Sequence, residues 1–438
     1  MSEADAATTR RGIVRPSAWY SGYALAVLFV VYVFNFIDRS ILNILAQAIK
    51  DDLKLYDWQV GLMGGLAFAA FYTTLGIPIA RLADTHNRRN IVAVCLTVWS
   101  GMTAVCGLAQ NFWHLLLARI GVAVGEAGGS PPAHSMISDL FTAERRATAL
   151  GIYALGIPVG TMIGNLAGGY LNEAMDWRTA FMVVGLPGVL IALLLRLTVA
   201  EPVRGFSGTA AQMRAAAPPV GFVFKALWAR KSFRYMTIGG GLHALVGYGV
   251  GPFIPSLFVR VHGWNTADIG QALFWLGFAG ILGTASGGYV ADRLGKRDMR
   301  WYVWLPALAT LISVPFSTSF YLLPDPALAL WIAAVPNFFG AYYLGPTFSL
   351  AQGLVGLRMR ALAASILLFI LNLIGMGLGP LFVGVTSDLL HAFAGLDSGQ
   401  ALRWALVSVL VFNVLSTAFY AMAAKDLKSD LARSHELS

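Results

Sequence analysis

The sequence has few charged residues and few of the residues that build catalytic or redox centres. Lys, Arg, Asp and Glu together make up 12% of the 438 residues, about half their share in a soluble globular domain. The two cysteines, Cys95 and Cys106, lie about 16 Å apart along a helix, too far to form a disulfide within it. No glycine-rich loop ends in Lys-Ser or Lys-Thr, and no metal-ligand spacing is present. We therefore expect no cofactor, no bound metal and no ATP-driven or thiol chemistry.

Long apolar segments dominate the chain. Hydrophobic residues make up 57% of it, and 47 residues are glycine, which lets membrane helices pack closely. Apolar stretches of about twenty residues, long enough to cross a bilayer as helix, recur with short polar breaks. The first stretch is longer than a signal-peptide core and has no cleavage site behind it, so we expect it to stay in the mature protein. We predict an all-α polytopic membrane protein with twelve transmembrane helices, at 20–45, 57–80, 90–109, 112–139, 146–171, 177–199, 233–259, 267–291, 301–322, 327–354, 361–387 and 401–423.

A ten-residue motif occurs twice in the chain. Residues 288–297 read G-x-x-x-D-R-x-G-K-R, and residues 80–89 are a degraded copy of the same pattern. Upstream of the two copies, residues 60–61 (Val-Gly) correspond to residues 269–270 (Ile-Gly) with a shift of one position. An internal repeat of this size predicts two homologous halves, an architecture typical of secondary transporters.

The positive charge of the chain follows the predicted topology. The net charge of +9 raises nucleic-acid binding as an alternative, but most of the 31 Lys and Arg residues lie in the tails, in a central linker and in loops after even-numbered segments. Such a bias is typical of cytoplasmic segments, so we expect cytoplasmic termini and no nucleic-acid partner. The halves are then 1–199 and 233–438, separated by a cytoplasmic linker at 200–232. Within it, residues 220–229 form either a helix on the membrane surface or part of a flexible tether.

Further stretches support a family resemblance. They are Arg119-Ile120-Gly121 through Gly125, the Gly- and Pro-rich residues 156–164, and residues 176–181, which read D-W-R-T-A-F. With the repeated motif and the central linker, the whole chain resembles the major facilitator superfamily. The resemblance implies two six-helix halves that transport a substrate by alternating access.

Three short runs resemble one branch of that superfamily, the spinster family of lysolipid and sphingolipid transporters. They are N-F-I-D-R at 35–39, G-V-A-V-G-E-A at 121–127 and I-P-V-G at 157–160. This resemblance implies a lysophospholipid or sphingolipid as substrate. We expect a monomeric, multi-pass protein of the bacterial inner membrane.

The superfamily resemblance also implies that the two motif copies latch the halves together on the cytoplasmic face when the pocket opens outward. A carboxylate in each copy, Asp84 or Asp292, can face the positive N-terminus of a helix from the other half. Arg88 and Arg89 of the first copy can reach Asp139 or Glu144 at the end of the fourth span. Thr85 stands where the motif has arginine, which weakens the expected latch of the first copy. As an alternative, the basic residues only enforce topology. The candidate gating residues are Asp84, Arg88, Arg89, Asp139, Asp292 and Arg293.

The N-terminal half carries four charged residues inside predicted membrane helices. Charges there are costly and face a cavity or a partner. From the helix rise, Asp38 and Arg119 lie at a similar depth and can pair, while Glu126 lies about two turns deeper than Arg119. Asp38 and Glu126 are the candidates for proton coupling, and Arg39 and Arg119 can bind an anionic headgroup. The alternative is a permanent structural set of salt bridges.

The C-terminal half has no counterpart to these charges. Its candidate substrate-binding residues are His243, Tyr248, Asn337, Tyr342 and Asn372. A cavity that is charged on one side and apolar-aromatic on the other suits an amphiphile, so we predict a proton-coupled transporter of lipid-like amphiphiles. A polyspecific exporter of hydrophobic drugs is the nearest alternative. A membrane-embedded lipid enzyme is a remote one, because the repeat symmetry argues against an unrelated catalytic site, and we expect no enzymatic activity.

Overall fold

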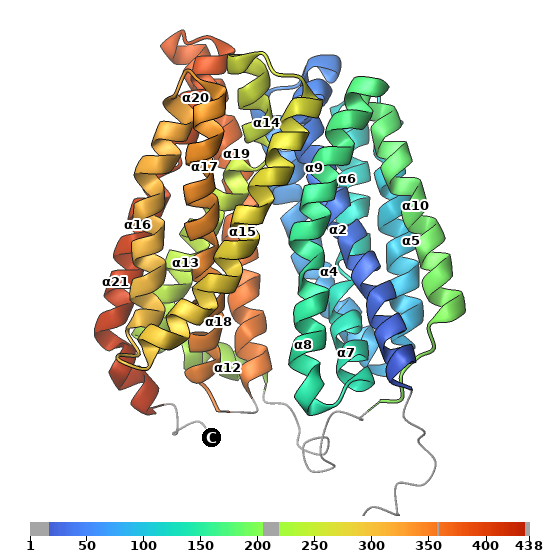
Figure 1. Cartoon of the computed structure of the whole chain (residues 1–438), viewed down its shortest axis with the longest axis vertical. Helices are drawn as coiled ribbons and strands as arrows, with labels where there is room; N and C mark the ends of the chain where they lie inside the picture. Colours follow the sequence, from blue (N-terminus) through green and yellow to red (C-terminus); the bar gives the residue numbers. More distant parts are fainter. Residues whose placement is uncertain (1–16, 205–218, 357–358, 434–438) are drawn as a thin grey trace, which may run out of the picture.

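The computed structural model describes residues 17–204, 219–356 and 359–433, and within these ranges it contains helices and no strands (Figure 1). Two bundles of roughly parallel helices lie side by side. The helices of the first bundle are α2 (Ala18–Leu53), α3 (Asp57–Gly64), α4 (Leu66–Thr85), α5 (Arg88–Cys106), α6 (Phe112–Glu126), α7 (Ser130–Leu140), α8 (Ala143–Ala154), α9 (Gly156–Ala174) and α10 (Trp177–Thr198). The predicted all-α membrane fold is confirmed.

The second bundle follows a short helix, α12 (Val220–Trp228), at the end of the linker. Its elements are α13 (Lys231–Val250), α14 (Phe253–Leu257), the π-helix η1 (Phe258–His262), α15 (Thr266–Gly295), α16 (Trp301–Leu322), α17 (Pro326–Gly340), the 3-10 turn η2 (Ala341–Tyr343), α18 (Leu344–Gly353), α19 (Arg360–Ala394), α20 (Ser398–Ser408) and α21 (Val411–Ala432). The division into halves at 200–232 stays a prediction, because residues 205–218 lie outside the described part of the chain.

Several predicted spans are interrupted rather than continuous. Among the described residues, ten helices are long and apolar enough to cross a membrane, or eleven if α13 and the segment from Phe253 to His262 count as one bent span. The bend of 47° follows Gly251-Pro252. The predicted span 112–139 consists of α6 and α7, separated at 127–129 by Ala-Gly-Gly ahead of two prolines. Proline lacks the N–H that would continue a helix and glycine weakens it, so these positions break the spans.

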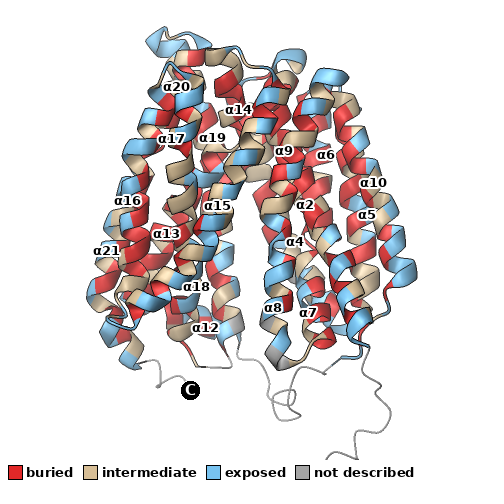
Figure 2. Ribbon diagram, viewed as in Figure 1, coloured by how far each residue is buried: buried red, intermediate tan, exposed pale blue. Residues whose placement is uncertain are grey.

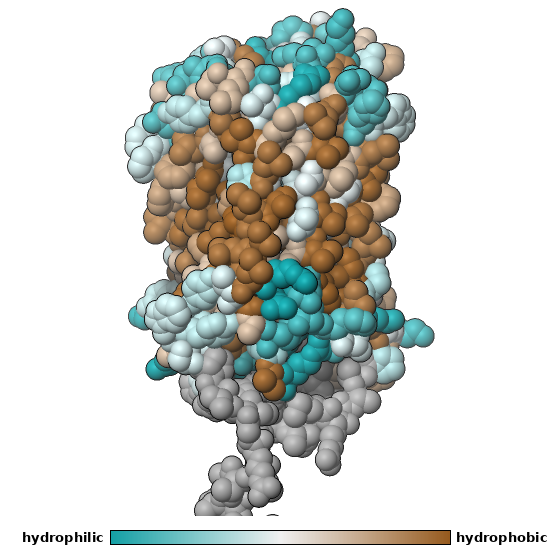
Figure 3. Space-filling model, turned by 90° about the vertical axis from the view of Figure 1, so that its right-hand side faces the viewer, coloured by the Kyte–Doolittle hydropathy of each residue, from teal (hydrophilic) through white to brown (hydrophobic). Residues whose placement is uncertain are grey.

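Burial and hydropathy place the bundles in a membrane. Figure 2 shows buried residues along the interfaces between helices and exposed residues on the outside. Large apolar side chains are strongly exposed there, including Leu197 at 73% and Trp331 at 80%. The face shown in Figure 3 is hydrophobic across its middle and hydrophilic towards both ends. An apolar band of this kind faces lipid, and the chain is an integral, multi-pass membrane protein.

The two bundles approach each other most closely at one end. The first and last described helices, α2 and α21, begin and finish at the other end, which we call the terminus end (Figure 1). Helix α3 packs against α19 and α9 against α15, and the bundles diverge towards the terminus end.

Two glycines of the internal repeat make this close approach possible. A Cβ atom on Gly61 would clash with the backbone carbonyl oxygen of Pro380 in the other bundle. A Cβ atom on Gly270 would clash with the carbonyl oxygen of Asn165 in the same way. The repeated Val-Gly and Ile-Gly pairs therefore mark equivalent contacts between the bundles, since only glycine lets two backbones come this close.

The linker helix α12 resolves one of the alternatives left by the sequence. Residues 220–228 are helical, with Val223 and Leu227 fully buried against the second bundle and Phe222 exposed at 53%. The described end of the linker is thus a packed helix. Its contact with a membrane surface stays a prediction.

Candidate functional site

A cavity of about 200 Å³ lies between the two bundles. The first bundle contributes both of its charged residues, and the second contributes small, apolar and aromatic ones. Its lining residues are Phe36, Arg39, Ser40, Leu42, Asn43, Gly64, Phe68, Arg119 and Thr161 from the first bundle, and Gly247, Tyr248, Gly251, Pro252, Met376 and Pro380 from the second. The cavity is thus cationic on one side and uncharged on the other.

Arg39 and Glu126 form an ion pair beside this cavity. The Arg39 Nε atom donates to Glu126 Oε2 over 2.5 Å. The Glu126 side chain is fully buried, whereas that of Arg39 is 18% exposed. Glu126 is the last residue of α6, at the break before α7. Arg39 can therefore reach a molecule in the cavity, while the buried Glu126 carboxylate compensates the positive charge of Arg39.

Asp38 is not part of this ion pair. It is fully buried, and its carboxylate lies near Glu126, Arg119 and the side chains of Thr103 and Trp99 on α5. Within the described residues no ion pair involves the Asp38 carboxylate. The Arg119 guanidinium donates instead to the backbone carbonyl of Asp38 over 3.3 Å. Depth along the helix predicted a pair between Asp38 and Arg119. Depth does not fix the direction of a side chain around its helix, and adjacent residues point about 100° apart. Asp38 and Arg39 therefore meet different groups.

Aromatic rings surround the two guanidinium groups. The Cζ atom of Arg39 lies 5.1 Å from the ring centroid of Phe36, 5.2 Å from that of Phe68 and 4.7 Å from that of Tyr72. The Cζ atom of Arg119 lies 5.3 Å from the Phe68 ring, which therefore contacts both cations. Cation–π contacts at these distances stabilise the two charges in a low-dielectric setting.

Sequence reasoning missed these rings because aromatic residues are common in membrane helices. The available signal was spacing. Phe36 lies one helical turn before Arg39, and Phe68 and Tyr72 lie one turn apart on the next span.

The glycines of two sequence runs explain how the charges are placed. A Cβ atom on Gly125 would clash with the backbone of Trp99, so the glycine before Glu126 brings α6 onto α5. A Cβ atom on Gly160 would clash with the backbone of Val33, and α9 therefore packs directly on α2. The runs at 121–127 and 157–160 thus position the helices that carry Arg39 and Glu126.

Of the candidate residues in the second bundle, only Tyr248 lines the cavity. His243 is buried, with its ring nitrogens 3.0 Å from Asn413 Oδ1 and 3.0 Å from the Gly340 carbonyl oxygen. Tyr342 is also buried and lies 3.1 Å from Ser286 Oγ. Asn337 donates to the Ala333 carbonyl oxygen of its own helix. Neither Asn337 nor Asn372 is part of the lining. Periodicity could place these residues on interior helices, but it could not separate cavity walls from helix interfaces.

The candidate gating residues of the first bundle bond to one another and to the first residues of the linker. Arg88 pairs with Asp139 over 2.5 Å and with Glu201 over 2.7 Å. The backbone N–H of Arg89 donates to the second oxygen of Glu201. Asp84 is exposed, and its backbone carbonyl accepts from Arg204. The alternative partner Glu144 has a side chain outside the described part of the structure.

The second motif copy also stays within its own bundle. Asp292 accepts a hydrogen bond of 2.7 Å from the Tyr302 hydroxyl, and Arg293 is exposed. Among the described side chains, none of the gating candidates makes a hydrogen bond or ion pair to the other bundle. The terminus-end latch that the sequence predicts is therefore not formed in this conformation.

Comparison with known proteins identifies the family. The family model of the Major Facilitator Superfamily matches residues 28–380. The chain belongs to the major facilitator superfamily. It is a transporter by family and fold, and its relatives within the superfamily include spinster proteins.

Three relatives of this superfamily member are informative. An MFS-type efflux pump of Mycolicibacterium smegmatis is 32% identical over 413 residues, covering 93% of this chain and 94% of the pump. Protein spinster homolog 1 of Xenopus tropicalis is 26% identical over 438 residues, covering 94% of this chain and 82% of the homologue. The third is a bacterial homologue of the human lysosomal transporter Spinster, whose crystal structure is inward-facing and unoccupied. Its sequence is 34% identical to this chain, and its structure matches with a TM-score of 0.86, covering 95% of this chain and 99% of that one.

Proposed function

We propose that this superfamily member is a secondary active transporter of amphiphilic, lipid-like molecules of the lysophospholipid or sphingolipid type, coupled to protons and working by alternating access. The observation that carries the proposal is the two-sided cavity. Arg39 and Arg119 supply cations for an anionic headgroup, while Tyr248, Met376 and Pro380 on the facing wall supply apolar surface. Arginine's planar fork suits phosphate. The spinster relatives support the same assignment.

Proton coupling is proposed to use Asp38 and Glu126. Both carboxyl groups are buried and interact with the cavity cations, Asp38 with Arg119 and Glu126 with both arginines, and only Glu126 has an ion-pair partner in the described structure. A buried carboxylate without a partner is costly, whereas its protonated form carries no charge. Gain and loss of a proton at these groups would therefore change the charge of the site during the transport cycle. A substrate anion could also compete with Glu126 for Arg39.

A polyspecific exporter of hydrophobic drugs is the second candidate. The efflux pump of Mycolicibacterium smegmatis favours it, since that protein is 32% identical to this chain. The two candidates differ in what the cavity cations do. An anionic lipid needs them directly, whereas a neutral hydrophobic drug does not.

The experiment that tests the proposal uses purified protein in liposomes under an imposed pH gradient. We expect gradient-driven uptake of a lysophospholipid that is recovered chemically unchanged. Uptake should fall at least tenfold in the Arg39→Gln variant. Uptake of a neutral dye but no lysophospholipid would favour the drug exporter, and recovery of a hydrolysed lipid would indicate an enzyme.

We also propose that both termini and the linker face the cytoplasm of a bacterial inner membrane, and that the protein works as a monomer. A cysteine at Val203, which is 54% exposed near the start of the linker, should stay unlabelled by an impermeant maleimide added to intact cells. A cysteine at Trp113, which is 66% exposed, should be labelled efficiently, because it follows Phe112, whose ring lies 6.0 Å from that of Trp58 at the opposite end. Both are placed in a variant with Cys95 and Cys106 replaced by serine. The reverse labelling pattern would contradict the topology.

A further inference from the structure

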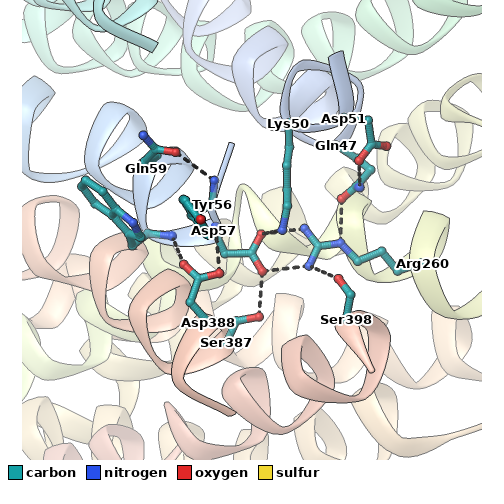
Figure 4. A network of polar contacts seen from close by, with 11 residues as sticks. Gln47, Lys50, Asp51, Tyr56, Asp57, Gln59, Arg260, Ser387, Asp388 and Ser398 are labelled. Atoms are coloured by element: carbon teal, nitrogen blue, oxygen red, sulfur yellow. Dashed lines mark hydrogen bonds and ion pairs between the residues drawn. The ribbon is translucent and has the colours of Figure 1, made fainter. Parts of the chain in front are cut away.

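At the end of the molecule opposite the termini, a carboxylate of one bundle caps a helix of the other (Figure 4). Asp388, near the end of α19, accepts hydrogen bonds from the backbone N–H groups of Asp57 and Trp58, over 3.1 Å and 2.8 Å. These are the first two residues of α3, where backbone N–H groups lack partners within the helix and the helix dipole is positive. The cap therefore joins the two bundles through the start of a helix.

A second carboxylate repeats this arrangement with the bundles exchanged. Glu173, near the end of α9, accepts hydrogen bonds from the backbone N–H and the hydroxyl of Thr266, each over 2.8 Å. Thr266 is the first residue of α15, and Asn172 also donates to its hydroxyl over 2.9 Å. Helices α3 and α15 are the starts of equivalent spans in the internal repeat, since they carry the corresponding glycines. The two caps are thus related by the symmetry of the repeat.

In the described part of the chain, a buried ion pair lies against the Asp388 cap and none lies against the Glu173 cap. The carboxylate of Asp57, on the first bundle, accepts from both terminal nitrogens of Arg260, on the second, over 2.6 Å and 2.8 Å. Lys50 and Ser387 complete its hydrogen bonds, over 2.6 Å and 2.7 Å. Figure 4 shows these groups converging on the Asp57 carboxylate from both bundles. The side chains of Asp57 and Arg260 are 3% and 6% exposed, so the pair is shielded from water.

We propose that Asp388 and Glu173 are a symmetric pair of caps that hold this end of the transporter closed, and that both must release for the site to open on that side. Opening separates α3 from α19 and α15 from α9. The hydrogen bonds from each helix start to its capping carboxylate must then break. The Asp57–Arg260 pair makes release harder on the Asp388 side. This inference rests on the proposed alternating access and does not depend on which substrate is carried.

The test measures how often this end opens, with spin labels at Trp113 on the first bundle and Phe393 on the second. Both positions are exposed, at 66% and 85%. The full chain lacking its native cysteines is reconstituted in lipid nanodiscs without substrate. The ratio of long to short label distances should rise about fivefold in Glu173→Ala and about tenfold in Asp388→Ala, and more in the double variant.

Conservative variants add a chemical signature. Asp388 uses both carboxylate oxygens, so Asp388→Asn turns an NH₂ group towards one N–H donor and should open this end nearly as often as alanine does. Glu173 uses one oxygen for both of its bonds. Glu173→Gln can keep that oxygen and should stay close to wild type. If an alanine variant does not fold, these two variants carry the test.

Caps within one bundle provide matched controls. Asp176 and Asp325 cap α10 and α17 from the residue just before each helix, at the same end of the molecule. Asp176→Ala and Asp325→Ala should leave the label distances unchanged. Unchanged distances in both Asp388 variants, or equal opening in these controls, would overturn the inference. Because the distances are measured without transport, a failed lysophospholipid assay would count against the proposed function and not against the caps.

Discussion

Replacing Asp38 with asparagine is expected to abolish gradient-driven transport while changing the free energy of unfolding by less than about 1 kcal/mol. The carboxylate forms no ion pair in the described structure, and Arg119 bonds to the backbone carbonyl of Asp38, which the substitution keeps. Asparagine has nearly the same shape and cannot exchange a proton. Transport of lysophospholipid under a pH gradient, substrate exchange without a gradient, and thermal unfolding in detergent measure the three consequences.

Exchange without a gradient should survive in the Asp38→Asn variant, because the cavity cations are untouched. Asp430→Asn is the matched control. It removes another buried carboxylate, one in the second bundle that accepts hydrogen bonds from Ser232 away from the cavity. That variant should lose stability and keep its response to the gradient. Full gradient-driven transport by Asp38→Asn would leave Glu126 as the proton carrier.

Removing Glu126 is expected to have the largest effect on stability. Glu126→Met leaves the Arg39 guanidinium without its buried partner, and breaking such a pair costs about 3–5 kcal/mol. The double variant Arg39→Met, Glu126→Met replaces the pair with apolar side chains and should recover much of that loss. Unfolding in detergent of the wild type, Arg39→Met, Glu126→Met and the double variant measures each term of this double-mutant cycle.

A transport assay separates the loss of stability from the loss of a cation in the cavity. The double variant should be stable and still inactive, since the cavity has lost a cation. The exposed ion pair between Arg178 and Asp52 is the matched control, with side chains 34% and 44% exposed. Its coupling energy should be below about 1 kcal/mol. A coupling energy for Arg39 and Glu126 no larger than that value would show that the pair does not stabilise the site.

We propose that the two ends of the transporter use the same physical device, a carboxylate that faces a helix N-terminus, at different stages of the transport cycle. The sequence motifs place Asp84 and Asp292 at the terminus end, where each can meet a helix N-terminus of the other bundle. In this conformation neither does so. Asp388 and Glu173 make that type of contact at the opposite end instead. A carboxylate facing a helix N-terminus is stabilising yet reversible, since its loss costs about 1 kcal/mol and exposes groups that water can satisfy. This suits contacts that break in every cycle.

The sequence by itself determined the helical membrane fold, the internal repeat and the four charges in the first bundle. These features depend on composition, on segment length and on the cost of burying charge, all of which can be read locally. The glycines of the sequence also predicted close helix packing. At Gly61, Gly125 and Gly160 a Cβ atom would clash with the backbone of a neighbouring helix.

The tertiary structure alone decided which charged groups meet. Helix rise placed Asp38 level with Arg119, but the direction of each side chain around its helix paired Arg39 with Glu126 instead. The caps by Asp388 and Glu173 join residues that are far apart in the chain, so no local pattern marks them. Depth in the membrane follows from one helix, whereas partners depend on how several helices are rotated against one another.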